Sequence, residues 1–343
     1  MKNRLAIIAL AVGPLALTTH PIQAADTTVP VTVDNFGRAE TDFYMSVINK
    51  RIGLGKFFHN RNFPPVEDKN VRPNRDTYYS EAIFDLDAGP VTVTLPDAGK
   101  RFMSFIVINE DHYVPVVYYG QGSYTLTKEN VGTRYVFTAV RTLVNPKFQN
   151  DVQTVHALQD AMTINQPHGP GTFEVPAWDP ASQKKVRDAL KTLGETLPDF
   201  RHAFGQKGEV DPIHHVIGTA SAWGGNPDRD ALYLNTTPEK NDETTTYQLT
   251  VPKDVPVDGF WSVTVYDAEG FFRKNEYDAY SLNSITAERQ TDGSARIQFG
   301  GCDGKISNCL PTMAGWNYTV RLYRPHKSVL DGSWTFPKAR PVN

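Results

Sequence analysis

Two long stretches of this chain alternate apolar with polar residues, and Gly or Pro interrupts them at roughly 8–12-residue intervals, as in antiparallel sandwiches or barrels. The run Trp261–Tyr266 is the clearest case, because Trp, Val and Val alternate with Ser, Thr and Tyr. Successive side chains of a strand point to opposite faces, so one face of this strand can be buried while the other stays wetter. This alternation limits the fold more strongly than composition does.

Helical periodicity interrupts the strand pattern in three places. It predicts a helix over 34–49 with Asp34 as its cap, a helix over 151–164, and one from the Asp179-Pro180 cap to Gly194. In the first half of the chain the pattern predicts these strands: 78–85, 91–95, 102–109, 114–119 and 135–140. Pattern alone therefore predicts a mainly β protein with a helical middle segment.

Motifs near both ends of the chain carry a family resemblance. They are Asn74-Arg-Asp-Thr-Tyr-Tyr-Ser and Asn109-Glu-Asp-His-Tyr in the first half, and Gly259-Phe-Trp-Ser, Gly315-Trp-Asn-Tyr and Leu330-Asp-Gly-Ser-Trp in the second. With them the chain resembles bacterial exported proteins that pair domain of unknown function 1254 (N-terminal) with domain of unknown function 1214 (C-terminal). The resemblance implies a β-domain over 25–145, a helical connector over 146–213 and a jelly-roll-like antiparallel sandwich over 214–343. It assigns no catalytic residue.

The first residues have the three parts of a signal peptide. Lys2 and Arg4 form a basic start, Leu5–Leu17 is apolar, and Ala24 provides a small residue for cleavage. We therefore expect residues 1–24 to be removed, and the protein to be periplasmic or secreted without a membrane span. An uncleaved anchor is the alternative, although the apolar run is shorter than the roughly 20 residues of a spanning helix.

The two cysteines, Cys302 and Cys309, are separated by a turn-rich spacer. In an exported protein this spacing predicts a disulfide at a hairpin tip. Free thiols and a metal site are the alternatives, but a zinc site needs four ligands, and no histidine or second cysteine pair lies nearby in the sequence.

Charge and motifs exclude several functions. The chain has 35 Lys and Arg against 38 Asp and Glu, with no basic block of the kind that nucleic-acid binding requires. Phosphate-binding glycine loops, the His-Glu-x-x-His zinc motif and the Gly-x-Ser-x-Gly elbow are missing from the sequence. No cofactor is predicted, and no motif supports a divalent metal.

The segment Asn74-Arg75-Asp76 comes directly before a predicted strand. Arg75 can bind a carboxylate through its planar fork, Asp76 can act as a base, and Asn74 and Tyr78 can contact a substrate. Tyr78 and Tyr79 point to opposite faces, so only one of them can join Arg75 in a pocket. The alternative is an Arg–Asp pair that only holds the loop.

Glu110 and His112 form the second candidate pair. In extended geometry both side chains point the same way, and a carboxylate beside an imidazole suits acid–base catalysis. The same pair could supply two metal ligands if a third came from elsewhere. A purely structural role for His112 is the remaining alternative.

The third candidate cluster is Trp223 with Asn226 and Tyr233. Glycines follow the tryptophan, so the loop can approach a ligand closely, and an exposed Trp is a common platform for one. A Trp packed in the seam between the domains is the alternative.

Two classes of function remain. The first is a small-polar-molecule binder or hydrolase, with Arg75, Asp76, Glu110 and His112 as catalytic residues between the two β-domains, because ligand sites favour domain interfaces. The second is a non-catalytic envelope scaffold or interaction protein, in which these clusters only hold loops together. A homo-oligomer is compatible with either.

Overall fold

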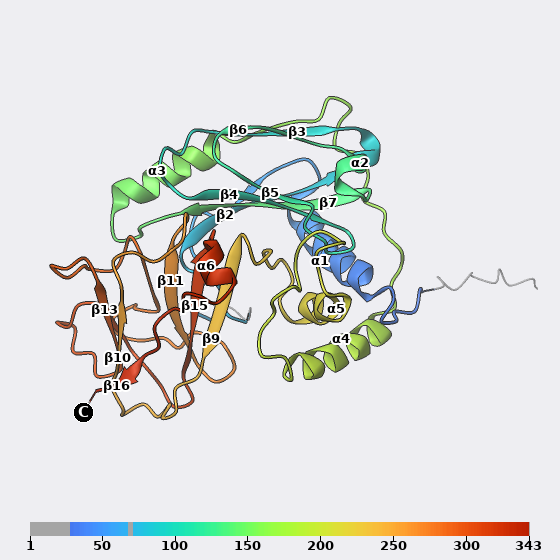
Figure 1. Cartoon of the computed structure of the whole chain (residues 1–343). Coiled ribbons are helices and arrows are strands. Elements are labelled where there is room, and N and C mark those ends of the chain that lie inside the picture. Colours follow the sequence, from blue (N-terminus) through green and yellow to red (C-terminus); the bar gives the residue numbers. More distant parts are fainter. Residues whose placement is uncertain (1–27, 68–70, 343) are drawn as a thin grey trace, which may run out of the picture.

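The computed structural model describes residues 28–67 and 71–342, so the predicted signal peptide lies outside the described residues. Figure 1 shows the N-terminal sheets across the top, the C-terminal strands below them in orange and red, and helices α4 and α5 beside those strands. The fold is mainly β with several units, as the sequence predicts.

Two antiparallel sheets form the N-terminal unit. The larger has the order β1-β2-β7-β4-β5, with bounds β1 Phe58–His59, β2 Thr77–Asp85, β7 Tyr135–Leu143, β4 Met103–Asn109 and β5 Val116–Tyr119. The smaller has the order β6-β3-β8, with bounds β6 Gly122–Leu126, β3 Val91–Leu95 and β8 Thr163–Asn165. Side chains such as Phe84, Val93 and Phe105 form one buried cluster between the sheets. A 3-10 turn (Leu86–Ala88) and a short helix α2 (Lys128–Val131) connect their strands.

Three helices lie on the outer face of the larger sheet: α1 (Phe36–Ile52), α4 (Pro180–Gly194) and α5 (Pro212–Ser221). Helix α3 (Gln149–Asp160) lies on the opposite face, on the same side as the smaller sheet. α1, α4 and α5 share one apolar cluster that contains Phe36, Leu190 and Ile217, whereas α3 packs near Tyr78 through Val155.

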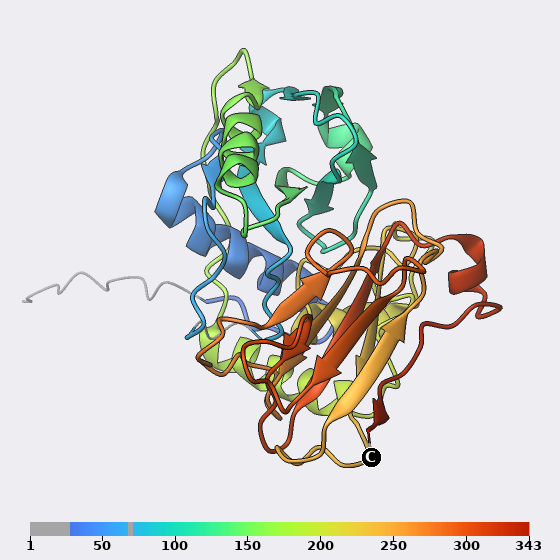
Figure 2. The ribbon, with the colours of Figure 1, turned by 90° about the vertical axis from the view of Figure 1, so that its left-hand side faces the viewer.

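The C-terminal unit is a sandwich of two sheets, which Figure 2 shows below the N-terminal sheets. One has the order β12-β11-β15-β9, with bounds β12 Ser281–Asn283, β11 Trp261–Tyr266, β15 Asn317–Tyr323 and β9 Ala231–Thr236. The other has the order β14-β13-β10-β16, with bounds β14 Cys309–Leu310, β13 Ala295–Phe299, β10 Tyr247–Val251 and β16 Arg340–Pro341. All pairings are antiparallel except β13 with β14, and helix α6 (Lys327–Leu330) follows β15.

The predicted strands of the first half are present with small shifts at their ends, the strands β1 and β6 were not predicted, and three further details differ. The first helix is capped by Asn35 instead of Asp34, and without a side-chain capping bond, because the Asn35 amide oxygen accepts from the Thr32 N–H at 2.8 Å. The predicted helix over 151–164 ends at Asp160, and the residues after it add β8 to the small sheet. Residues 212–221 form α5, a helix that the pattern analysis missed.

The predicted disulfide is present. Cys302 and Cys309 are bonded, with 5.7 Å between their Cα atoms. They close the loop that leads into β14, at the edge of the sheet farther from the N-terminal unit.

Candidate functional site

The sheet β12-β11-β15-β9 is buried on both faces. Its apolar face, with Trp261 and Val263, forms the sandwich core. Its other face is polar: Ser262, Arg321 and Tyr233 lie side by side on three neighbouring strands. This polar face lies against the N-terminal unit. Side chains on it such as Ser262, Thr264, Thr319, Arg321 and Tyr323 have almost no solvent exposure. Burying polar groups costs free energy unless they find hydrogen-bond partners. The partners of the polar side chains in this seam therefore have to be identified.

A cavity of about 370 Å³ lies in the seam. Its residues come from the segment before β2, from β2 itself, from the loops before and after α5, and from β9 and β15. They are Val71, Arg72, Asn74, Tyr79, Phe200, Arg201, Phe204, Ser221–Asn226, Asp228, Ala231–Tyr233, Asn235, Thr319, Arg321 and Tyr323. This volume falls at the lower end of the range typical of small-molecule sites, roughly 300–1,000 Å³.

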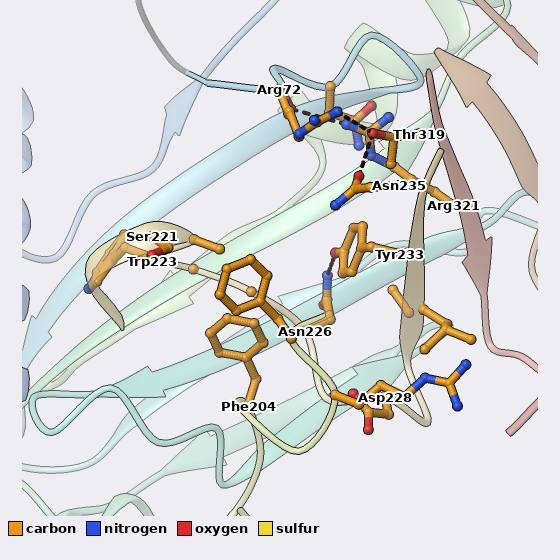
Figure 3. Close-up of a pocket in the computed structure, with 18 of the residues that line it drawn as sticks. Arg72, Phe204, Ser221, Trp223, Asn226, Asp228, Tyr233, Asn235, Thr319 and Arg321 are labelled. Atoms are coloured by element: carbon orange, nitrogen blue, oxygen red, sulfur yellow. Dashed lines mark hydrogen bonds between the residues drawn. The ribbon is translucent and has the colours of Figure 1, made fainter. Parts of the chain in front are cut away.

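Arg72 and Arg321 form the positive end of the cavity, where Figure 3 shows them beside Thr319 and Asn235. Arg72 donates to Thr319 Oγ1 at 2.8 Å, and Thr319 in turn donates to Asn235 Oδ1 at 2.7 Å. Arg321 donates to Tyr266 at 2.6 Å and to the Arg72 carbonyl at 3.0 Å. Within the described residues neither guanidinium has a carboxylate within 4.0 Å, and the buried Asp76 carboxylate acts on Arg321 only from farther away.

A third arginine supports the cavity wall from β7. Arg141 is buried and donates to the Tyr79 hydroxyl, to Asn226 Oδ1 and to the Gly224 carbonyl, each at 3.2 Å. Like the other two, it has no acidic partner within 4.0 Å among the described residues. Arginine keeps its proton in proteins, so all three side chains carry charge.

Three tyrosine hydroxyls of the lining already accept an internal hydrogen bond. Tyr79 accepts from Arg141, Tyr233 from Asn226 Nδ2 at 2.8 Å, and Tyr323 from Asn74 Nδ2 at 2.8 Å. Among the described residues none of the three hydroxyls donates its proton in a hydrogen bond, so each can donate to a ligand. Burial and the neighbouring Tyr233 and Tyr79 raise the pKa of Tyr323 well above its usual value, so this hydroxyl stays protonated.

The amide oxygens of the lining are occupied. Asn74 Oδ1 accepts from the Asp76 N–H at 2.6 Å, Asn226 Oδ1 from Arg141, and Asn235 Oδ1 from Thr319. The cavity therefore offers many donors and few side-chain acceptors, which favours a ligand that brings acceptors of its own.

The other end of the cavity is largely apolar. The Phe204 ring lies against Gly225, where an added Cβ would come within 2.4 Å of the ring, so this position needs a glycine. Trp223 contributes an edge only, because its faces are covered by Tyr44 (ring centroids 4.5 Å apart) and His112 (5.5 Å). The packed alternative for Trp223 is thus the one found, in place of an open stacking platform.

The structure brings four of the five predicted binding residues to this cavity: Asn74, Trp223, Asn226 and Tyr233. The fifth, Tyr78, points to the opposite side of β2 and packs against Phe63 and His156, while Tyr79 faces the cavity in its place. The sequence predicted that only one of these two tyrosines could join the pocket. One does so, but it is Tyr79 and not the predicted Tyr78.

Arg75 and Asp76 do not line the cavity. The Arg75 guanidinium lies over the rings of Tyr280 and Phe63, at 4.9 and 5.4 Å, in a groove near the disulfide loop. Asp76 is fully buried and accepts from Ser281 and from Asn283, at 3.2 and 3.1 Å. No Arg75–Asp76 ion pair forms among the described residues, so the pair proposed from the sequence is absent there.

Glu110 and His112 do not share an extended strand. The segment after β4 is a turn, and His112 has a positive φ of 66°, so its side chain is not directed with that of Glu110. Glu110 accepts from the Tyr135 N–H at 2.9 Å and lies 3.8 Å from Arg38. The four residues chosen as catalytic thus have separate surroundings, and a shared catalytic role for them stays a prediction.

His112 instead holds the cavity wall from behind. It is fully buried, and its Nε2 accepts from the Gly224 N–H at 2.8 Å, so the proton is on Nδ1, which lies 2.8 Å from Thr219 Oγ1. Burial, and then His215, lower its pKa well below the usual value, which keeps the ring neutral. The neighbouring residues His214 and His215 both lie on α5.

Sequence reasoning missed Arg72, Tyr79, Arg141, Arg321 and Tyr323. A signal for Arg321 was available, because an arginine stands in the middle of the strand Asn317–Tyr323 on the face where Thr319 and Tyr323 also lie. A charged side chain inside a fully buried strand is uncommon and often functional.

Family models match the two halves of the chain. Residues 54–166 match DUF1254, and residues 230–327 match DUF1214. Both are families of proteins of unknown function. The chain therefore belongs to the proteins that carry these two domains in this order. The first match reaches residue 166 and includes α3 and β8, so part of the predicted connector belongs to the N-terminal unit.

Solved structures with the same fold come from two bacteria. A Vibrio parahaemolyticus protein has 17% identity and a TM-score of 0.68, over 91% of this chain and 98% of its own. An uncharacterized Burkholderia cenocepacia protein has 12% identity and a TM-score of 0.52, over 89% of this chain and 87% of its own. At these identities the likeness shows the fold alone. A search of curated proteins gives no match.

Two further searches of the structure were negative. Across residues 28–67 and 71–342, no group of three or more His, Cys, Asp or Glu side chains is placed to hold a metal ion. Over the same ranges, no helix has both the length and the apolar character needed to cross a membrane.

Proposed function

We propose that this protein binds a small organic anion in the cavity between its two β-rich units. The observation that carries the proposal is the excess of free donors in the lining. Arg72, Arg321 and the hydroxyls of Tyr79, Tyr233 and Tyr323 can all donate, while the amide oxygens beside them are already bonded within the described structure. Carboxylates, sulfates and phosphates accept hydrogen bonds without needing to donate, so they match this surface.

Charge supports the same conclusion. Burying a cation without a counter-charge is unfavourable, and removing one partner from a buried pair typically costs about 3–5 kcal/mol. Arg72 and Arg321 lie together in the seam without an acid within 4.0 Å among the described residues. A bound anion would supply the missing charge, and the planar guanidinium suits a carboxylate in particular.

The apolar end indicates that the anion has a hydrocarbon body. Phe200, Phe204 and Leu232 line it, and they offer no hydrogen bonds to an inorganic ion. An alkyl or aryl carboxylate would place its charged head at the arginines and its body against these side chains.

We assign no reaction to the site. Ser221 lines the cavity, but its hydroxyl has no hydrogen bond to a histidine or carboxylate in the part of the chain that the structure describes. Activation by such a base is what nucleophilic hydrolysis requires. Binding therefore has more support than hydrolysis, and the scaffold function is the outcome if no anion binds. The disulfide fits an exported protein, and we include a periplasmic or secreted location in the proposal.

Thermal unfolding with and without small anions tests the proposal. Benzoate, heptanoate and sulfate are compared with benzamide, which has the shape of benzoate without its charge. A ligand at 100 times its Kd stabilises the folded state by about 2.7 kcal/mol, which raises Tm by roughly 4 °C for a protein of this size. We expect this shift with at least one organic anion and none with benzamide.

Matched variants locate the binding. Arg72→Gln should remove the shift, whereas Arg296→Gln, at an exposed position on β13, should keep it. No shift with any of the three anions, or an unchanged shift in Arg72→Gln, would contradict an anion site at this place.

A further inference from the structure

Asp228 is the acidic side chain of the cavity lining. It lies in the loop between α5 and β9 and keeps 22% of its side-chain surface exposed. Figure 3 shows it at the end of the cavity away from Arg72 and Arg321, with Tyr233 and Asn226 between the two ends. The cavity thus has two arginines at one end and, at the other, the Asp228 carboxylate with Arg201 nearby.

Only one oxygen of this carboxylate has a partner. Oδ2 accepts from the His202 N–H at 3.0 Å and lies 3.6 Å from the His202 ring. Oδ1 makes no hydrogen bond with any described residue. The fully buried Asp85, by contrast, accepts from Arg134, Asp87 and Thr172.

Nearby cations are already paired with other acids. The Arg201 Nε lies 3.4 Å from Asp199, and Arg229 donates to Glu209 at 2.7 Å. Neither guanidinium lies within 4.0 Å of Asp228 among the described residues. Burial, the largest influence, raises the pKa of Asp228 above its usual value, although the nearby His202 and Arg201 lower it in part.

From these two ends we infer that the natural ligand is a zwitterion, an organic acid whose far end carries an ammonium group that binds Asp228. Amino-terminated carboxylic acids, with an alkyl spacer lying along Phe204 and Leu232, are the simplest members of this class. The inference rests on the proposed anion site and specifies its substrate class. Its physical basis is charge complementarity, which contributes more to selectivity than to total affinity.

Isothermal titration calorimetry with paired ligands tests the inference. Each amino acid is compared with the acid of the same length that ends in a methyl group. The pairs are 4-aminobutanoate with pentanoate, 6-aminohexanoate with heptanoate, and 8-aminooctanoate with nonanoate. We expect the amino-terminated member of at least one pair to have a Kd at least five times lower than that of its methyl-terminated partner. The chain length of the tightest-binding amino acid then indicates the distance between the arginines and Asp228.

Two variants with the same charge change distinguish the site from its surroundings. Asp228→Asn keeps an acceptor for the His202 N–H but removes the charge, so the preference for the ammonium should vanish. Asp254→Asn removes an exposed charge that does not line the cavity, so the preference should persist.

The outcomes separate the inference from the proposed function. If methyl-terminated acids bind and no amino-terminated partner is favoured, the zwitterion is excluded while the anion site stands. A preference that survives in Asp228→Asn also excludes it. If neither member of any pair binds, the anion site falls as well.

Discussion

Tyr233→Phe separates a ligand-binding role from a structural one. The Tyr233 hydroxyl accepts one hydrogen bond, from Asn226 Nδ2 at 2.8 Å, and faces the cavity. Without it, water in the cavity can accept from the Asn226 amide, so the loss of stability should stay near or below about 1 kcal/mol. A bound anion, however, would lose a donor. Hydrogen bonds to charged groups contribute about 1.5–3 kcal/mol, which corresponds to a roughly tenfold to hundredfold weaker Kd.

Tyr135→Phe is the matched control. The Tyr135 hydroxyl donates to the Thr172 carbonyl at 2.8 Å and accepts from the Glu174 N–H at 2.7 Å, and it does not line the cavity. Losing both bonds should lower the free energy of unfolding by about 1–2 kcal/mol and leave anion binding unchanged.

Urea unfolding gives the free energies of unfolding, and calorimetry with the best-binding anion gives the dissociation constants. The reasoning predicts opposite patterns: Tyr233→Phe loses mainly affinity, and Tyr135→Phe loses mainly stability. Unaltered affinity in Tyr233→Phe would refute the role of the tyrosine hydroxyls as ligand donors. Equal affinity losses in both variants would indicate a general loosening of the fold instead.

Three further predictions concern stability and processing. Asp42 is buried, and burial raises its pKa from 3.8 to about 7 even though it accepts from the Trp178 N–H, so the folded state holds its proton between these values. The free energy of unfolding should therefore fall as pH rises from about 4 to 7 and then level off, a change of up to about 4 kcal/mol. In urea titrations Asp42→Asn should show a weaker dependence of this free energy on pH, and an unchanged dependence would contradict the assignment. Replacing Cys302 and Cys309 by Ser should lower the unfolding free energy by about 2–3 kcal/mol, from loop-closure entropy, without changing anion affinity, and a weaker Kd would link the loop to the site. N-terminal sequencing of protein from the cell envelope should begin at Ala25, and an intact Met1 there would exclude cleavage.

The sequence pattern predicted the strands well because alternation is a local property. Trp261–Tyr266 correctly indicated a strand with an apolar and a polar face. The expectation that the polar face is wetter was wrong, since Ser262 and Thr264 are fully buried. That burial depends on the N-terminal unit, and the contact between Arg72 and Thr319 joins residues 247 positions apart. Local pattern contains no information about such docking.

Other differences come from backbone details. The positive φ of His112 turned its side chain away from Glu110, and a non-glycine residue in this conformation is hard to predict without the surrounding structure. The helix α5 was detectable, because Asp211-Pro212 repeats the cap-and-proline signal of Asp179-Pro180. Its apolar residues Ile213, Val216, Ile217 and Ala220 also recur at helical spacing, so a signal for this helix was present in the sequence.

The seam favours a ligand site over a purely structural junction. An apolar contact between the units would be at least as stable, since replacing buried ionic groups by packed apolar ones is often neutral or stabilising. Here two arginines, Arg72 and Arg321, line one cavity and a third, Arg141, lies behind its wall, and the amide and hydroxyl partners that hold them use up the acceptors around them. The acceptors around the cavity are satisfied, while donors and positive charge face it. A bound anion would accept from these donors and balance this charge. The scaffold alternative explains the loops around Arg75 and Glu110, but it gives no reason for this imbalance.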